Sequence, residues 1–324
     1  MKLKILGAAA LLLTSATIVQ ADSWTGYTYS SVSTTSAVKG MKKITEQVEQ
    51  KTGGDLSIDL HLGKTLQISS SDITQAVGDG IVDFAADFFF SGNVPIGRVL
   101  SLPMLIENDE EWAKAYKAVE PILVKAFGKQ GVILLGGYRY PEQTIFTTFK
   151  IDDLTDLEGH KIRVTSPEQG HFIKEFKGAA ITLSGSEVPT SLERGVIEGV
   201  LTASAGGAKK WGEFLPYNYR FAVNYGNSVI IANKDSFEAL SPDAQKALRE
   251  TVAKVGPETT AAFLVDEEVQ KKKQSNAGMT LIAAKAGDAD MARKKMIPFW
   301  ESWAKENGPE YEAALKLVRD AVNK

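Results

Sequence analysis

The chain has 324 residues, with 37 basic and 40 acidic side chains, a net charge of −3 and no cysteine. This slightly acidic balance argues against nucleic acid or an anionic membrane surface as the partner. Without cysteine there is no disulfide or thiol chemistry, and the length is sufficient for two lobes with an adequate core.

The first 21 residues have the pattern of an export signal. Lys2 and Lys4 precede a short apolar run at 5–13, and Val19-Gln20-Ala21 ends the segment with small residues. The run is too short to span a bilayer, and no later stretch is long and apolar enough. We therefore expect 1–21 to be a cleaved signal peptide, with a periplasmic mature chain that does not insert into the membrane.

Helix and strand patterns alternate after this segment. Apolar residues at helical spacing from Val38 to Val48 predict a helix that Gly53-Gly54 ends, and the alternation over 56–62 predicts a strand. Residues 72–79 predict a second helix, and 81–90 predict the next strand. Such alternation is typical of an α/β fold with a largely parallel sheet.

An internal repeat is visible in the central part of the chain. The segment 72–83 has a counterpart at 187–198, offset by 115 positions. Both copies predict a helix, a turn at Gly80 or Gly195, and a strand. The repeat predicts two similar α/β lobes, an arrangement that commonly closes over a ligand in the cleft between them.

The C-terminal part is predicted to be helical. Ser241-Pro242 begins one helix, and 258–276 forms another of roughly 28 Å that braces the lobes. Trp300 and Trp303 are expected to pack inside a closing helix pair. The expected division is lobe I at 22–137 with return segments at about 228–265, lobe II at 138–227 with late segments at about 266–295, and C-terminal helices at 296–324.

The sequence lacks the motifs of common catalytic and metal sites. His61, His160 and His171 have no metal-ligand spacing, and cysteine is absent. There is no nucleophile elbow, phosphate-binding loop or dinucleotide fingerprint. We therefore expect a binding protein without metal or cofactor rather than an enzyme.

Several segments, in the correct order, resemble the solute receptors of tripartite ATP-independent periplasmic (TRAP) transporters, of the dicarboxylate-receptor type. Residues 156–164 read DLEGHKIRV and are similar to the family's "DLKGxKIRV". Residues 186–188 (SEV) and 192–199 (LERGVIEG) are similar to "SEVYxALQxGVVDG". The weaker matches are VEQKTGG at 48–54 and SLPML at 101–105.

The resemblance implies a periplasmic binding protein-like fold, in which two α/β lobes close over a carboxylate ligand and a long helix braces them. It also implies partners, a small and a large membrane subunit that take up the organic acid. In the family, the arginine of the "KIRV" strand binds the ligand carboxylate, which makes Arg163 the principal candidate. An arginine fork can hold a carboxylate bidentately, although from the strand alone a surface ion pair is the alternative.

Other site candidates come from departures from the family pattern and from strand ends. Thr202 and Ser204 lie where many members carry an asparagine, and Arg139 is a candidate second contact for the ligand. The "SEV" segment adds Glu187. Strand ends and lobe crossings add four residues: Phe89, for which core packing is the alternative, Ser91, Tyr225 and Asn227.

The departures argue against a dicarboxylate or a sialic-acid-like ligand and leave a monocarboxylate open. The sequence leaves two alternatives to a TRAP receptor. One is an ABC-type substrate-binding protein, which shares the two-lobe design, and the other is a periplasmic ligand-sensing protein.

Overall fold

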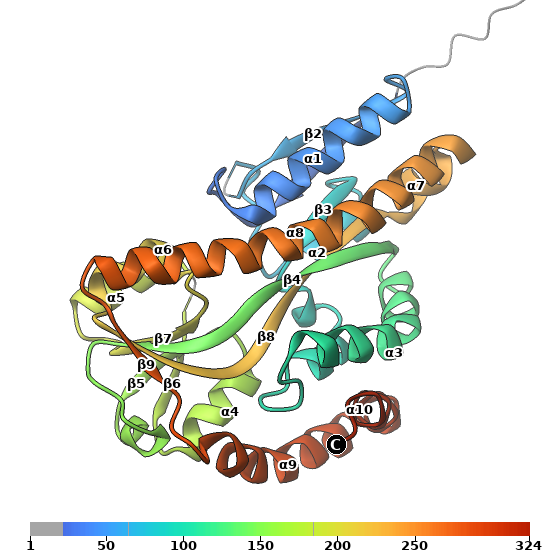
Figure 1. The fold of residues 1–324 in the computed structure, drawn as a ribbon. Helices are drawn as coiled ribbons and strands as arrows, with labels where there is room; N and C mark the ends of the chain where they lie inside the picture. Colours follow the sequence, from blue (N-terminus) through green and yellow to red (C-terminus); the bar gives the residue numbers. More distant parts are fainter. Residues whose placement is uncertain (1–21, 64, 184) are drawn as a thin grey trace, which may run out of the picture.

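The computed structural model describes residues 22–63, 65–183 and 185–324. Its strands form one mixed sheet in the order β2-β1-β3-β8-β4-β7-β5-β6, and β9 pairs with β8 (Figure 1). The strands are β1 (Asp22–Thr28), β2 (Leu56–His61), β3 (Phe84–Asp87), β4 (Val132–Thr147), β5 (Lys161–Val164), β6 (Ala179–Thr182), β7 (Gly199–Thr202), β8 (Tyr217–Asn233) and β9 (Thr280–Ala283).

The two ends of the sheet have the same topology. In the first lobe β1 pairs in parallel with β2 and β3, and β3 pairs antiparallel with β8. In the second lobe β5 pairs in parallel with β6 and β7, and β7 pairs antiparallel with β4. The expected α/β fold with two similar lobes is thereby confirmed, but the sheet is mixed rather than largely parallel, because β8 pairs antiparallel with β3 and β4, and β4 with β7.

The sequence repeat corresponds to a repeated hydrogen-bond pattern. Asp83 donates its backbone N–H to Thr25, and its carboxylate accepts the Thr25 N–H at 2.8 Å. Glu198 makes the same two bonds with Lys161, the second at 3.0 Å. The turns before them need glycine, since Gly80 has a φ of 71° and Gly195 a φ of 65°. Each acidic residue thus joins its strand to the neighbouring one.

Two long strands, β4 and β8, run through both lobes and pair antiparallel along their length. Their register shifts between Arg139 and Glu142, opposite the Tyr225 to Asn227 stretch. A bulge bends the strand that carries it and interrupts the ladder locally. The pairing of β4 with β8 is therefore irregular at the crossing point between the lobes, as it also is at Leu134–Gly136 and Gln143–Ile145.

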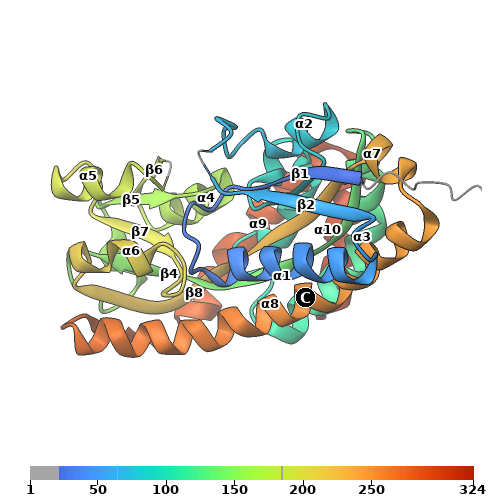
Figure 2. The same cartoon turned by 90° about the horizontal axis from the view of Figure 1, so that it is seen from above.

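The longest helix, α8, lies across both lobes, and α1 runs beside it (Figure 2). The helices are α1 (Ser36–Lys51), α2 (Ile73–Gly78), α3 (Asp109–Gly128), α4 (Pro167–Glu175), α5 (Val188–Glu193), α6 (Ala208–Trp211), α7 (Lys234–Ala239), α8 (Pro242–Asn276), α9 (Asp288–Asn307) and α10 (Pro309–Val322), with 3₁₀ turns η1 (Phe90–Gly92), η2 (Pro95–Ser101), η3 (Leu154–Leu157) and η4 (Gly212–Phe214).

The helix α8 corrects one sequence prediction. The two helices expected after Ser241 are one continuous helix of 35 residues, about 52 Å long, with Pro257 inside it. Gly-Pro usually ends a helix. Here the helix continues through Pro257, and α8 packs closely on β4 at this point, since a Cβ on Gly256 would lie 2.4 Å from the Gly137 carbonyl oxygen. Likewise the strand expected at 81–90 is shorter, since Phe90 begins a 3₁₀ turn.

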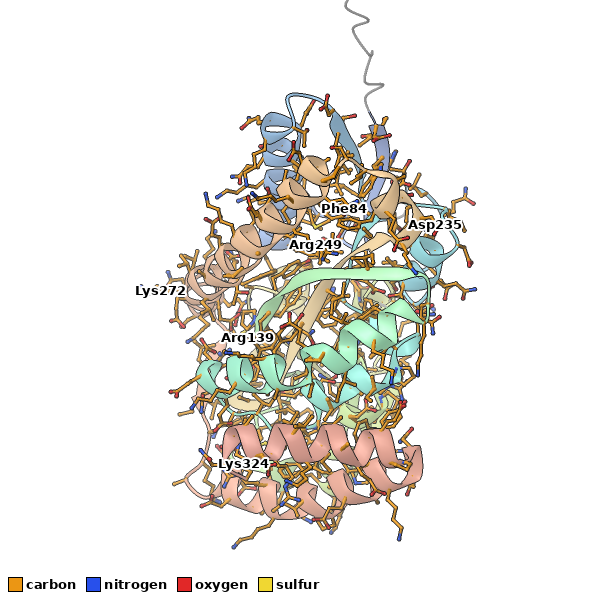
Figure 3. The ribbon with its side chains drawn as sticks, turned by 90° about the vertical axis from the view of Figure 1, so that its right-hand side faces the viewer. Phe84, Arg139, Asp235, Arg249, Lys272 and Lys324 are labelled. Atoms are coloured by element: carbon orange, nitrogen blue, oxygen red, sulfur yellow. The ribbon has the colours of Figure 1, made fainter. Side chains whose placement is uncertain are left out.

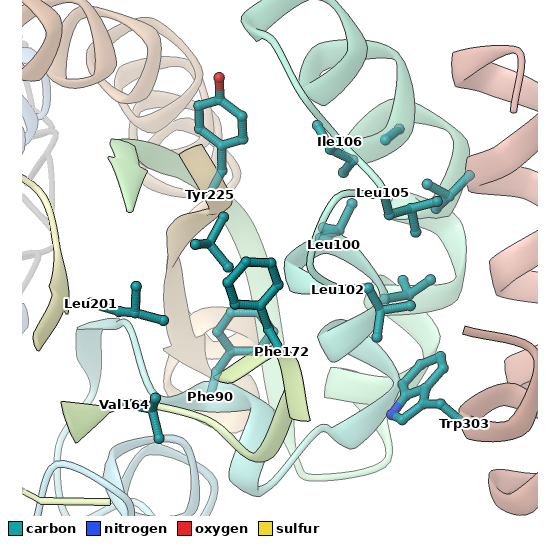
Figure 4. Close-up of a cluster of buried hydrophobic side chains, with 14 of the residues drawn as sticks. Phe90, Leu100, Leu102, Leu105, Ile106, Val164, Phe172, Leu201, Tyr225 and Trp303 are labelled. Carbon is teal, nitrogen blue, oxygen red and sulfur yellow. The ribbon is translucent and has the colours of Figure 1, made fainter. Parts of the chain in front are cut away.

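The largest apolar cluster among the described residues includes residues of both lobes and of α9 and α10 but none of α8, and Figure 4 shows part of it. It joins Val164 and Phe172 of the second lobe to Leu100 of η2, to Leu102 just after η2 and to Trp300 of α9. The Trp300 indole also donates to the carbonyl of Pro103 at 2.8 Å, so the expected packing of the closing helices is confirmed. The exact division into lobe I, lobe II and C-terminal helices remains a proposal, because α9 runs across the expected boundary at 295–296.

None of the helices in the described ranges is long and apolar enough to cross a membrane. The expected signal peptide, at 1–21, lies outside the described residues.

Candidate functional site

A small cavity of about 50 Å³ lies where β4 and β8 pass between the lobes. Residues 88–91 after β3 and Gly97 and Ser101 of η2 contribute the first-lobe wall. Thr165, Ser166 and Gln169, at the start of α4, contribute the second-lobe wall. The strands add Gln143 and residues 224–227. The described walls therefore come from both lobes, and none of their side chains is an acid, a lysine or an arginine.

One wall of the cavity is a chain of hydrogen bonds between the lobes. The carbonyl oxygen of the Gln169 side chain accepts from the backbone N–H and the hydroxyl of Thr165, both at 2.9 Å. Its amide nitrogen donates to Asn224 at 3.1 Å, and Asn224 donates to the Ser101 carbonyl at 2.7 Å. This series of hydrogen bonds starts in the second lobe, crosses β8 and ends in the first lobe.

The opposite wall is aromatic. The rings of Phe88 and Phe89 lie 5.1 Å apart in an edge-to-face arrangement. Behind them, Tyr29 packs on Phe89 at 5.6 Å and Tyr140 on Phe88 at 4.9 Å. The hydroxyls of Tyr29 and Tyr140 bond to one another. This gives the cavity an apolar face built from the segments that follow β1 and β3 and from Tyr140 of β4.

Asp87 holds the aromatic segment 88–90 in place through a hydrogen bond to its backbone. Its carboxylate is completely buried and accepts from the N–H of Phe89 at 2.7 Å and from the hydroxyl of Thr74 at 2.7 Å. Burial outweighs these bonds and raises the pKa of Asp87 to about 6. The residue thus positions Phe89 and does not itself line the cavity.

Arg163 is buried next to the cavity wall rather than in it. The apolar neighbours Ile162 and Val164 face the core, so Arg163 points to the other side of β5. Its Nε and Nη2 both donate to the Leu183 carbonyl, at 3.0 and 2.9 Å, and its guanidinium lies 5.5 Å from the Trp211 ring. The side chain is 4% exposed, and this burial lowers its pKa to about 10. It therefore stays charged at neutral pH.

No carboxylate among the described residues lies within ion-pair distance of Arg163, whereas Arg139 has such a partner. The Arg139 guanidinium lies 2.6 Å from Asp109 at the start of α3, and it covers the ring of Tyr225 at 4.7 Å. Arg139 is labelled in Figure 3. Desolvation lowers the pKa of Arg139, and Asp109 partly offsets this. Arg139 thus lies behind the cavity wall, with its charge already neutralised.

Thr202, Ser204 and Glu187 also lie outside the cavity wall. The hydroxyl of Thr202 accepts the Gly207 N–H at 2.9 Å. Ser204 belongs to a network in which its N–H donates to Glu267 of α8 at 3.2 Å and its hydroxyl bonds to Arg220 at 3.3 Å. Glu187 is exposed in the turn before α5.

Four of the predicted site residues do meet at the cavity: Phe89, Ser91, Tyr225 and Asn227. Sequence reasoning did not include Gln143, Gln169 or Ser101, which also line it. The sequence does contain a local pattern that places Gln169, because the residue lies in the first turn of a helix with a capping serine. It lies three residues after Ser166, the helix-capping residue whose hydroxyl accepts the Gln169 N–H at 3.2 Å.

Within 22–63, 65–183 and 185–324, no group of three or more histidine, aspartate or glutamate side chains is arranged to hold a metal ion.

Comparison with known proteins identifies the fold family. Residues 28–307 match the model of the bacterial extracellular solute-binding proteins, family 7. A curated solute-binding protein of Chromohalobacter salexigens is 25% identical over 320 residues, which cover 96% of this chain and 93% of the relative.

Two solved structures share the whole fold. One is an extracytoplasmic solute receptor of Bordetella pertussis that binds pyroglutamic acid, with a TM-score of 0.85 and 23% identity, covering 94% of this chain and all of that one. The other is a TRAP periplasmic solute-binding protein of Chromohalobacter salexigens with bound D-glucuronate. Its TM-score is 0.85 and its identity 22%, and the match covers 92% of this chain and 99% of that one. The chain belongs to the bacterial extracellular solute-binding proteins of family 7.

Proposed function

We propose that this protein is the periplasmic receptor of a TRAP-type secondary transporter, and that it binds a small organic acid through its carboxylate and delivers it to a small and a large membrane subunit. Family membership supports the receptor role over an ABC-type receptor or a sensing protein. Similar proteins bind pyroglutamate or uronic acids, all of which carry a carboxylate.

The state of Arg163 is the observation that carries this proposal. A guanidinium that is 4% exposed costs several kcal/mol to desolvate unless an anion or a full set of acceptors compensates it. Among the described residues its only hydrogen-bond acceptor is one carbonyl, that of Leu183, although arginine has five N–H donors. A ligand carboxylate would supply the missing charge and accept the remaining donors bidentately.

Calorimetry on three variants tests the role of Arg163. A thermal-shift screen of pyroglutamate, D-glucuronate, D-galacturonate and orotate first supplies a ligand. Arg163→Ala is then expected to lose about 2–5 kcal/mol of binding free energy. Arg163→Lys should also bind poorly, because a point charge does not reproduce the fork.

Arg194→Ala is the matched control, since Arg194 is an exposed arginine of the second lobe outside the cavity wall. It changes the net charge equally and should bind like the parent. Folded Arg163→Ala with parental affinity would show that the arginine is structural.

A further inference from the structure

We propose that the ligand of this receptor carries a single carboxylate and a second polar group that is uncharged, such as a lactam, an amide or a hydroxyl, which enters the cavity between Phe88, Gln143 and Asn227. This proposal rests on the proposed function, because it assigns the other end of the ligand whose carboxylate Arg163 holds. It narrows the substrate class from organic acids in general to compact monocarboxylates.

The cavity offers no charge to a second carboxylate. None of its described wall residues is charged, and Arg98 and Arg139, which lie outside the wall, are each paired with a carboxylate. Arg98 lies 3.7 Å from Glu168, and its Nε donates to the Ser91 carbonyl at 3.2 Å. Arg139 lies behind Tyr225 and pairs with Asp109. A second carboxylate in this space would be desolvated without a cation, which is strongly unfavourable.

The amides of the cavity are suited to a neutral group. Thr165, Gln169, Asn224 and Ser101 bind one another in the chain described above and keep little capacity for a ligand. Gln143 and Asn227 remain. The Gln143 amide nitrogen donates to the Pro141 carbonyl at 3.0 Å, which leaves its side-chain oxygen as an acceptor.

Asn227 completes the donor and acceptor set. Its side chain is 6% exposed and makes no hydrogen bond with the described part of the chain. A primary amide provides both donors and an acceptor. Gln143 and Asn227 together can therefore accept the N–H or O–H of a neutral group and donate to its oxygen, which a lactam, an amide or a hydroxyl satisfies.

The size of the cavity also favours a small neutral group. A volume of about 50 Å³ has room for roughly three to five water molecules. The flanking rings of Phe88 and Phe89 favour a flat group of a few atoms over a branched one. Thr165, a wall residue, lies two positions beyond Arg163, immediately after β5.

Acids that differ only in the second group test the proposal. The full chain is titrated by calorimetry with pyroglutamate (a lactam), glutarate (a second carboxylate) and cyclopentanecarboxylate (no second polar group). Pyroglutamate is expected to bind at least tenfold more tightly than either of the others. Equal or tighter binding of glutarate or cyclopentanecarboxylate overturns the proposal while leaving the carboxylate receptor intact. If no acid of this set or of the wider screen binds, the proposed function fails and this proposal fails with it.

Two variants assign the preference to the cavity. Asn227→Leu should weaken pyroglutamate binding by roughly three- to tenfold, the range for a neutral hydrogen bond, and should change cyclopentanecarboxylate binding by less than twofold. Gln143→Met should act in the same way and serves if Asn227→Leu does not fold. Asn276→Leu, at an exposed asparagine that ends α8, is the control and should alter neither affinity. Equal losses for both acids in both cavity variants would show a structural effect and contradict the assignment.

Discussion

Arg98 and Glu168 join the two lobes at the rim of the cavity, with 3.7 Å between Nη1 and Oε1. Arg98 belongs to η2 of the first lobe, and Glu168 to the first turn of α4 in the second. The Glu168 side chain is 2% exposed, and its other oxygen has no partner among the described residues. The Arg98 guanidinium is thus the main group that offsets the burial of the Glu168 carboxylate. Because the two residues belong to different lobes, this contact exists only when the lobes are together.

Arg98→Ala should therefore weaken ligand binding. It leaves Glu168 buried and unpaired in the closed form, which we expect to cost about 1.4 kcal/mol, or tenfold in affinity, since the pair is long and Arg98 is partly exposed. Arg98→Ala combined with Glu168→Gln should regain most of that loss, because no buried charge remains. Calorimetry over the complete double-mutant cycle measures the coupling. Additive losses would show that the pair does not couple the lobes.

Ligand binding should also make the protein more compact. The cavity walls come from both lobes, so contacts of a ligand with both exist only when they are closed. Small-angle scattering with and without the ligand found by screening should show a smaller radius of gyration in its presence. An unchanged radius would indicate a rigid pocket.

Asp87 should make stability depend on pH. The pKa of Asp87 in the folded state, about 6, lies above its ordinary value of 3.8, so between these values the folded state binds more protons than the unfolded state. Its contribution is then fully present below about pH 4 and is lost as the pH rises towards 6 and beyond. The unfolding free energy of the parent relative to Asp87→Asn should fall by about 2–3 kcal/mol from pH 4 to pH 7. Urea unfolding at a series of pH values measures this difference, and a constant difference would contradict it.

The close contact between α8 and β4 predicts that an added methyl group at Gly256 lowers the stability of the protein. A methyl group on Gly256 would meet the Gly137 carbonyl oxygen at 2.4 Å, and backbone there cannot move without disturbing the long strands. Gly256→Ala should therefore lower the unfolding free energy by about 1–3 kcal/mol despite the better helix propensity of alanine. Gly128→Ala is the control, since nothing lies within 4 Å of its added carbon at the end of α3, and it should be neutral or stabilising. Equal effects in urea unfolding would show that the close contact is unimportant.

Export predicts a defined mature N-terminus. The small-residue pattern Val19-Gln20-Ala21 predicts cleavage after Ala21. N-terminal sequencing of the protein from the periplasmic fraction should therefore begin at Asp22. A periplasmic protein that still carries Met1 would refute the cleavage.

The sequence alone was sufficient for the features that depend on local hydrogen bonds and periodicity. The repeat at 72–83 and 187–198 carries its own turn, because glycine adopts the positive φ found at both Gly80 and Gly195 without strain. The apolar flanks of Arg163 showed which face of β5 it occupies. The match of 156–164 to a receptor motif led to the family, and all of these signals lie within short segments.

The tertiary structure alone decided what depends on distant neighbours. Gln169 and Asn224 are 55 residues apart, and Asn224 and Ser101 are 123 apart, yet they form one wall. Arg139 was a candidate ligand contact by type, but its ion pair with Asp109 depends on how α3 packs against β4. The helix α8 continues through Pro257 because packing against α1 and β4 outweighs the local preference of Gly-Pro to end a helix. Such outcomes are set by which surfaces meet, and a one-dimensional pattern does not contain that information.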